Sequence, residues 1–408
     1  MNPTLVARRS FIVTLGLLTA VAALTVDLSL PAIPEMVRLL ATDLPEGQLI
    51  VGVFMLGMAC GQIPAGLFSD RAGRLPVLYA GMSLFALAGT VAAFSNSIDV
   101  LLAARFVQGI GAASAIVLAR AIVRDVSHGK ESARLMSLMT MIFTAAPVLA
   151  PTIGAVMVAQ WGWRAPFIGI AVLAYMIFIL VRTNLVETHE PNVNVNPVRQ
   201  LVSSFREFFS HRQSIFGLLM IVTPPAGFMS VIAISAAMTV EIYGFSIQQY
   251  GLIFACAGIS ILLGAAVNRW LVTRYDQLQL IGLGVGLIFL SCAQLTIIAV
   301  LDYAPFWWVW MCICLYMFTV AILMSNAMVV AMDPLPRIAG VASSIVGTIQ
   351  NVAGAAGALI AAAIYDGSVR NAVLIMAGAG LLLTLFFLLR PLIAPGDLVH
   401  NPDELARD

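Results

Sequence analysis

The chain has 408 residues, of which 61% are hydrophobic and 10% are charged, and its formal net charge is +1. Soluble domains contain about a quarter charged residues, so this composition excludes a soluble globular protein and indicates a protein that lies in lipid. A net charge this close to zero gives no reason to expect a nucleic-acid partner.

Twelve long apolar runs predict twelve transmembrane helices. The runs are roughly 20 residues long and do not alternate, which favours helices over the shorter strands of a β-barrel. The first run follows Arg8 and Arg9, as a secretory signal would, but it continues to Pro31 and is expected to be an uncleaved span. The expected spans are residues 10–33, 48–68, 76–95, 98–120, 135–158, 165–185, 213–240, 247–268, 278–301, 306–331, 338–364 and 370–391.

The longest polar stretch lies between the sixth and seventh spans and divides the chain into two halves. When the N-terminus is placed inside, seventeen basic residues fall in inner segments, whereas only Arg38, Arg164 and Arg370 fall outside. This bias predicts that both termini are cytoplasmic. The expected parts are an N-terminal six-helix bundle (1–186), a cytoplasmic linker (187–212), a C-terminal six-helix bundle (213–395) and a cytoplasmic tail (396–408).

Two charged residues lie deep inside apolar runs of the first half. At 1.5 Å per residue, Asp27 in span one and Arg105 in span four both fall about 10 Å below the same membrane face. A bare charge in hydrocarbon is costly, so such residues are expected to face the bundle interior or a wet cavity, to pair, and to mark a transport path. The alternative is a structural role, with Asp27 as a hydrogen-bond acceptor and Arg105 bound to backbone carbonyls.

The loop after span two combines glycines with charges. The loop contains Gly66, Asp70, Arg71, Gly73 and Arg74. Gly73 predicts a turn, and the three charged residues predict a compact charge cluster at the inner membrane face. An acidic group placed there can also interact with the positive N-terminal end of a neighbouring helix. An ordinary basic inner loop is the alternative interpretation.

Spans four and five carry small residues and prolines at helical spacing. Arg105, Gln108 and Gly109 share one face of span four, as expected for a cavity wall or a close packing seam. In span five, Pro147, Pro151 and Gly154 shape the helix, and a kinked packing helix without transport function is the alternative.

These segments together resemble the major facilitator superfamily. The loop at 66–74 is similar to its signature loop, residues 105–113 to its buried-arginine motif, and residues 146–155 to its antiporter motif, although alanine replaces glycine at Ala146, Ala150 and Ala155. The segment from Asp27 to Pro34 resembles the acidic motif of twelve-span drug:proton antiporters, and in particular of the Bcr/CflA subfamily.

The resemblance implies an all-α membrane protein with the facilitator fold, in which two six-helix bundles surround a central cavity. It implies export of small amphipathic drugs across a bacterial inner membrane in exchange for protons. In this hypothesis Asp27 binds and releases the proton, Arg105 stands close by as its counter-charge, and residues 66–74 form a conformational switch. The antiporter motif would comprise Pro147, Pro151 and Gly154.

The second half carries no deep charge, and its resemblance rests on hydropathy. Phe228 in span seven and Gln350 and Asn351 in span eleven are the candidate substrate contacts, although polar residues inside spans often only hold helices together. The segment from Gly264 to Arg269 faintly repeats the pattern from Gly66 to Arg71.

The remaining chemistry of the sequence is sparse. Five cysteines lie in apolar runs without metal or disulfide spacing, and four histidines lie in loops or the tail, so neither a metal nor a cofactor is expected beyond the proton as coupling ion. We expect a functional monomer whose partners are a small-molecule drug and membrane lipid. A carrier of a physiological metabolite is the nearest alternative. A membrane enzyme or receptor would show clustered catalytic groups or a soluble domain, and neither is visible.

Overall fold

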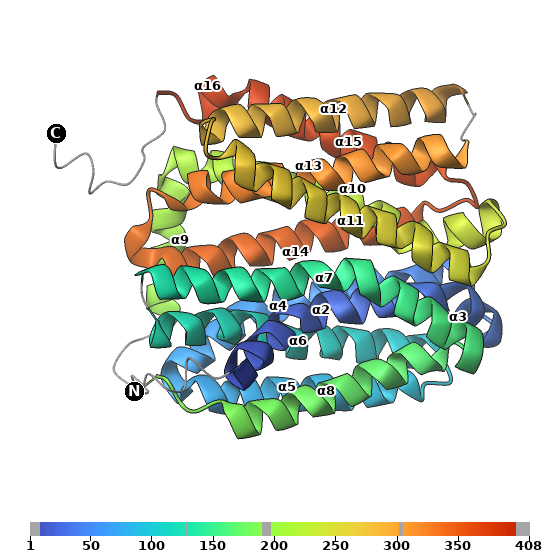
Figure 1. Cartoon of the computed structure of the whole chain (residues 1–408), viewed down its shortest axis with the longest axis horizontal. Helices are drawn as coiled ribbons and strands as arrows, with labels where there is room; N and C mark the ends of the chain where they lie inside the picture. The colour runs from blue at the N-terminus through green and yellow to red at the C-terminus, as the bar shows by residue number, and fades with distance from the viewer. Residues whose placement is uncertain (1–8, 128, 190–196, 302–304, 397–408) are drawn as a thin grey trace. The chain divides into compact units, whose positions relative to one another are not determined.

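The computed structural model describes residues 9–127, 129–189, 197–301 and 305–396. Within these residues it contains helices and no strand (Figure 1). Twelve of the helices are long and apolar enough to cross a membrane, as the sequence predicts. Most of their ends lie within a few residues of the predicted ones, while α4 and α6 extend further, to Ala72 and Val126. The predicted tail lies almost wholly outside the described residues, which end at 396.

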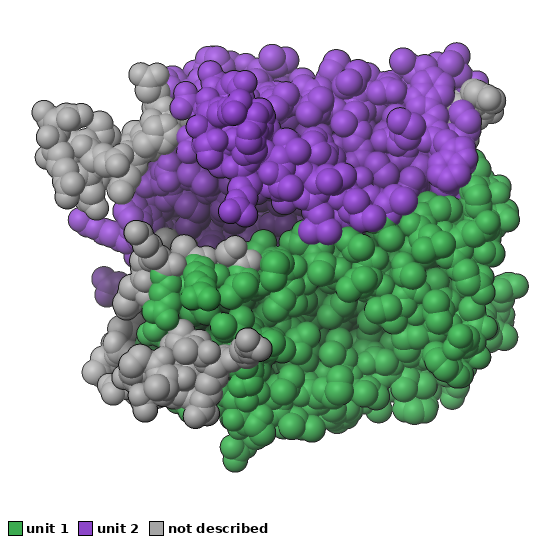
Figure 2. Space-filling model, viewed as in Figure 1, with its two compact units in different colours: residues 1–198, 239–255 green, residues 199–238, 256–408 purple. Residues whose placement is uncertain are grey.

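The chain divides into two compact units, which Figure 2 distinguishes by colour. Unit 1 comprises residues 1–198 and 239–255, and therefore contains the first six spans and the short segment that includes the end of the seventh and the start of the eighth. Its helices are α2 (Arg9–Ser29), η1 (Leu30–Ala32), α3 (Ile33–Leu39), α4 (Leu44–Ala72), α5 (Arg74–Ala93), α6 (Ile98–Val126), α7 (Gly129–Trp161) and α8 (Arg164–Asn184).

Unit 2 comprises residues 199–238 and 256–408. A π-helical turn, η2 (Met238–Ile242), and the first residues of α11 connect it with unit 1 along the chain. The helices assigned wholly or largely to unit 2 are α9 (Pro197–Ser210), α10 (Arg212–Ala237), α11 (Ile247–Leu271), α12 (Gln277–Leu301), α13 (Phe306–Met332), η3 (Pro336–Ile338), α14 (Ala339–Ala363), α15 (Arg370–Leu388) and α16 (Arg390–Ile393).

The segment predicted as a linker is more structured than expected. Residues 187–189 are bonded to unit 1, residues 190–196 lie outside the described residues, and residues 197–210 form the helix α9. The division between the units falls at Val198 and Arg199. The predicted stretch 187–212 therefore contains the end of one unit and a helix of the other.

Prolines explain why the first span is not one continuous helix. Pro31 has no N–H, so the Asp27 carbonyl lacks the hydrogen bond that residue i+4 of a helix normally donates. For the same reason, Pro34 donates no hydrogen bond to the Leu30 carbonyl. The chain takes a single 3₁₀ turn at this point, where the N–H of Ile33 donates to the carbonyl of Leu30. Asp27 therefore lies in the last regular turn of α2 before a break.

Glycines let the helices that carry the candidate residues approach closely. A Cβ atom on Gly57 of α4 would lie 2.1 Å from the Phe106 carbonyl oxygen, and one on Gly109 of α6 would lie 2.1 Å from the Phe54 carbonyl oxygen. Real Cβ atoms do not approach oxygen atoms so closely, so both positions require glycine for this packing. The α4 and α6 backbones are thus in direct contact one turn beyond Arg105.

Candidate functional site

Three charged residues are buried among those that the structure describes: Asp27, Arg74 and Arg105. All three belong to unit 1. Uncompensated buried charge is expensive, so the partners of each residue indicate what that residue can do. The three differ sharply in this respect.

Arg105 on α6 is held by neutral groups. Its NH1 group donates to Gln108 Oε1 at 2.9 Å, and its NH2 group donates to Ser29 Oγ at 3.3 Å and to the Thr25 carbonyl oxygen at 3.5 Å. The guanidinium carbon also lies 4.7 Å from the ring centroid of Phe54, a distance at which a cation is attracted by the ring face. Arg105 is fully buried, and its Nε–H has no partner within the described residues.

Asp27 on α2 has neither a hydrogen bond nor an ion pair within the described part of the chain, and only 6% of its surface is exposed. The predicted direct pair with Arg105 is therefore wrong for this structure. The depth estimate is sound, because Arg105 reaches residues on either side of Asp27 in sequence, Thr25 and Ser29. Helical periodicity explains the missing pair: Thr25 and Ser29 share one side of α2, whereas Asp27 lies about 200° around the helix from Thr25.

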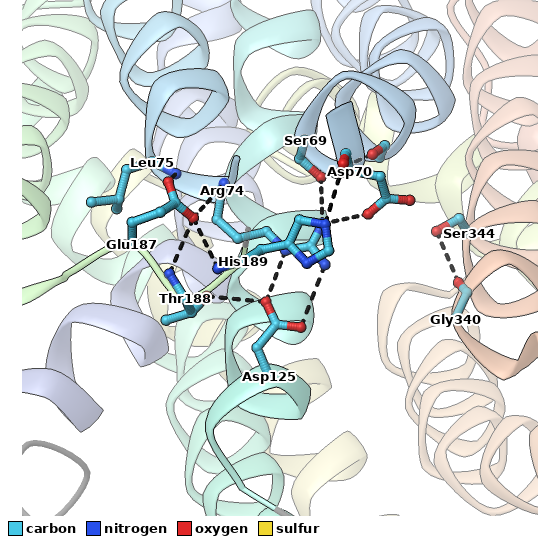
Figure 3. A network of polar contacts seen from close by, with 11 residues as sticks. Ser69, Asp70, Arg74, Leu75, Asp125, Glu187, Thr188, His189, Gly340 and Ser344 are labelled. Carbon is cyan, nitrogen blue, oxygen red and sulfur yellow. Dashed lines mark hydrogen bonds and ion pairs between the residues drawn. The ribbon is translucent and has the colours of Figure 1, made fainter. Parts of the chain in front are cut away.

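Arg74, at the start of α5, is the centre of a charged network (Figure 3). Its Nε–H donates to Asp125 Oδ2 at 2.8 Å and its NH2 group to Asp125 Oδ1 at 3.4 Å, so that the guanidinium contacts both oxygens of one carboxylate. Its NH1 group donates to Ser69 Oγ at 2.9 Å and to the carboxylate of Asp70. Arg74 therefore connects the ends of α4 and α6 with the start of α5.

Glu187, which follows α8, caps the N-terminus of α5. Its carboxylate accepts the N–H of Arg74 at 2.8 Å and the N–H of Leu75 at 2.9 Å (Figure 3). The first N–H groups of a helix have no partner within the helix, and the helix dipole favours a negative charge there. Partial burial raises the pKa of the Glu187 carboxyl, but hydrogen bonds from four backbone N–H groups outweigh it and leave the pKa below the ordinary value of 4.5.

Gly73 makes this cap possible. Its φ of 97° lies in the region that favours glycine, and a Cβ atom there would lie 2.7 Å from Glu187 Oε2. The segment from 187 to 189 is fixed by two further contacts, in which Thr188 Oγ1 donates to Asp125 Oδ2 at 3.0 Å and the His189 ring donates to the Asp70 carbonyl oxygen at 3.2 Å.

The predicted charge cluster is thus only partly correct. Asp70 and Arg74 are bonded, but Arg71 is exposed and makes no hydrogen bond or ion pair with any residue that the structure describes. An arginine one residue after Asp70 in the last turn of α4 points to a different side of the helix. Asp125, Glu187 and His189 complete the network, and the sequence analysis did not select them.

A profile of the Major Facilitator Superfamily matches residues 15–358, which is most of the chain. The chain belongs to this superfamily. Together with the twelve spans and the bacterial relatives described next, this makes it a membrane transporter that crosses the inner membrane many times. The resemblance inferred from the loop at 66–74 and the motifs of spans one, four and five is thereby confirmed.

Similar proteins align with nearly the whole length of this chain. The bicyclomycin resistance protein homolog of Haemophilus influenzae is 28% identical over 359 residues, which cover 87% of this chain and 90% of the relative. Multidrug resistance protein D of Escherichia coli strain K12 is 28% identical over 386 residues, which cover 93% and 95%. Among solved structures, a D-xylose-proton symporter superposes with a TM-score of 0.74 at 18% identity, covering 92% and 97%, which shows a shared fold.

The other predicted facilitator motif residues have packing contacts in unit 1. Gln108 is buried, bonds Arg105 and lies against Gly89 of α5, while Gly109 packs on α4. In α7, Pro147 and Pro151 lie inside a continuous helix, and a Cβ atom on Gly154 would lie 2.4 Å from the Leu28 carbonyl oxygen, next to Asp27 in sequence. Gly154 therefore brings α7 close to the turn that carries Asp27.

In unit 2, the three candidate substrate residues lie on two helices that pack together. Phe228 is on α10, Gln350 and Asn351 are on α14, and all three are half-buried. The two helices meet where a Cβ atom on Gly357 would lie 2.0 Å from the Ala226 carbonyl oxygen. Neither Gln350 nor Asn351 makes a hydrogen bond with another described residue, so their amides are available for other partners.

Proposed function

We propose that this chain exports small amphipathic drugs in exchange for protons, and that Asp27 is the group that binds the proton. The names of the bicyclomycin and multidrug resistance relatives support the substrate class. The observation that carries the coupling is the isolation of Asp27. It is the one buried carboxylate among the described residues, and it has no partner there.

An unpartnered carboxylate in an apolar bundle is costly as an anion, and a proton or a cationic drug group removes that cost. The two ligands compete for the same negative charge. When Asp27 is open to the outside, a proton binds its carboxylate and a bound drug leaves. When Asp27 is open to the cytoplasm, the proton departs and the carboxylate is free for the next drug. Protons thus move inward as drug moves outward.

The role of Arg105 in this proposal differs from that of a direct counterion. Its hydrogen bonds to Thr25 and Ser29 hold α6 against one side of α2, and Asp27 lies on the opposite side of that helix. Arg105 is thus a positioning residue, and its fixed positive charge on the far side of α2 lowers the cost of the Asp27 anion through space. Gln108 in turn orients the guanidinium.

The network around Arg74 is proposed as the conformational switch. It connects α4, α5 and α6 with residues 187–189, so a change in the position of any of these segments has to break charged hydrogen bonds. The excess of basic residues in the inner loops supports a cytoplasmic position for this network and for both termini. The protein is proposed to act as a monomer without metal or cofactor, with a drug, protons and lipid as its partners.

Transport into proteoliposomes with an imposed pH gradient tests the proposal. Wild type is expected to move a cationic amphipathic dye against its own gradient. Asp27→Asn should bind the dye weakly but lose gradient-driven movement, because an amide does not exchange a proton in this pH range. Asp276→Asn, at an exposed position between α11 and α12, is the matched control and should behave like wild type. Undiminished gradient-driven transport by Asp27→Asn would contradict the assignment.

A further inference from the structure

The helix α9 (Pro197–Ser210) has an apolar side that is wider than the protein covers. At 100° per residue, Leu201, Val202 and the three phenylalanines occupy a sector of about 120°, and the arginines, the serines and Glu207 lie outside it. A helix with a strongly apolar side and a charged side lies in a membrane interface more often than across a membrane.

Burial divides the apolar sector into two edges. At one edge Phe208 is fully buried and the neighbouring Ser204 is 3% exposed, so this edge packs on the protein. At the other edge Val202 is 60% exposed and Phe209 is 43% exposed. Arg206 projects next to this second edge and is itself exposed. The exposed surface of α9 thus has two apolar side chains, Val202 and Phe209, beside the cation of Arg206.

The position of α9 in the chain places this surface at the level of the membrane boundary. A single residue, His211, separates α9 from α10, and α10 is a membrane span that begins at Arg212. His211 has an extended backbone, so the chain turns between the two helices. Figure 1 shows α9 running across the direction of the spans of unit 2. Arg212 is exposed at the same boundary and adds a second cation.

We infer that α9 is a binding surface for acidic phospholipids of the inner leaflet, with Val202 and Phe209 at the acyl boundary and with Arg206 and Arg212 at the phosphates. Charge complementarity favours this occupant, because arginine forms strong hydrogen bonds with phosphate and acidic lipids attract basic helices next to a span. Burial of the exposed valine and phenylalanine in the membrane interface removes their apolar surface from water and so favours binding. This inference goes beyond the proposed function and does not depend on it.

Hydrogen exchange of residues 197–210 in the full-length protein tests the inference. The protein is placed in nanodiscs of phosphatidylcholine, with or without phosphatidylglycerol. The acidic lipid is expected to slow exchange in α9 and to leave α12 unchanged. Arg206→Gln should weaken the response to the acidic lipid about fivefold, the effect of one arginine at a membrane surface. Val202→Ser should reduce protection in both nanodiscs, and both variants replace exposed side chains, so folding is retained.

Two controls separate the sources of the effect. Arg370→Gln, at an exposed arginine at the start of α15, should leave the response of α9 unchanged. Soluble glycerol phosphate should not protect α9, because it carries the charge without an acyl boundary. Equal exchange of α9 with and without phosphatidylglycerol would overturn the inference, and so would equal protection by glycerol phosphate.

Discussion

Arg105 donates a hydrogen bond to Ser29 Oγ at 3.3 Å, on the side of α2 that faces away from Asp27. The Ser29 hydroxyl donates in turn to the Val26 carbonyl oxygen at 2.8 Å, which leaves its lone pairs for the guanidinium. Arg105 therefore holds α2 and α6 together, and Asp27, on the other side of α2, has no partner among the described residues. In the proposed function, this separation leaves the acid free to bind a proton or a drug.

Gln108→Leu is expected to destabilise the protein by about 1.5–3 kcal/mol, because it leaves one N–H group of a buried guanidinium without its acceptor. Unfolding in mixed micelles measures the change. Ser95→Ala is the control, since the Ser95 hydroxyl bonds only the neighbouring Ala92 carbonyl, and it should cost less than about 1 kcal/mol. Equal losses in the two variants would mean that Gln108 does not support Arg105.

Gly109→Ala should loosen the contact between α4 and α6. The new Cβ atom would lie 2.1 Å from the Phe54 carbonyl oxygen, and overpacking of this kind costs about 1–3 kcal/mol. Gly286→Ala is the control, because a Cβ atom on Gly286 in α12 meets nothing within 4 Å, and a helical alanine there should leave stability unchanged or raised by about 0.5–1 kcal/mol. The same unfolding assay checks both, and an unaffected Gly109→Ala would refute the close contact.

Asp125→Asn should impair transport and stability more than Asp70→Asn. The Asp125 side chain is 18% exposed and contacts Arg74 through two hydrogen bonds, whereas the Asp70 side chain is 50% exposed. Exposed ion pairs contribute less than about 1 kcal/mol, while hydrogen bonds to a buried charge contribute about 1.5–3 kcal/mol. Unfolding and dye-transport assays of the two variants, measured in parallel, show which variant loses more stability and transport. The reverse order would show that Asp70, rather than Asp125, holds Arg74.

The lowered pKa of Glu187 leads us to expect a specific dependence of stability on pH. Since its pKa is lower in the folded protein than the ordinary value of 4.5, its cap on α5 is fully present above about pH 4.5 and is lost as the pH falls through the lower, folded pKa. Wild type should therefore lose stability in this acidic window. Glu187→Gln should be less stable at neutral pH and should lack this part of the acid dependence. Parallel pH profiles of the two proteins would exclude the cap.

The spans and the level of the buried charges could be predicted from the sequence because they follow from length and apolarity. Counting residues along two helices placed Arg105 level with Asp27, and the hydrogen bonds to Thr25 and Ser29 agree. Counting did not show which side of α2 meets α6. That side depends on how the two helices pack, and in the structure it is the side that carries Thr25 and Ser29.

The partners of Arg74 could be predicted only in part. Asp70 lies four residues before Arg74, within reach on helical spacing, but Asp125 and Glu187 are 51 and 113 residues away in sequence. No local pattern indicates such a contact. The helix α9 did leave a signal, because Leu201, Phe205 and Phe208 have helical spacing, and this apolar periodicity inside a polar linker could have been recognised.

The most direct measurement of the central claim is proton release on drug binding, followed with a pH indicator in weakly buffered detergent solution. At a pH where Asp27 is protonated in the free protein, a saturating cationic drug is expected to release protons from wild type and from Asp276→Asn. Asp27→Asn is expected to release none while it still binds drug, as calorimetry would show. Proton release from Asp27→Asn equal to that of wild type would contradict the account.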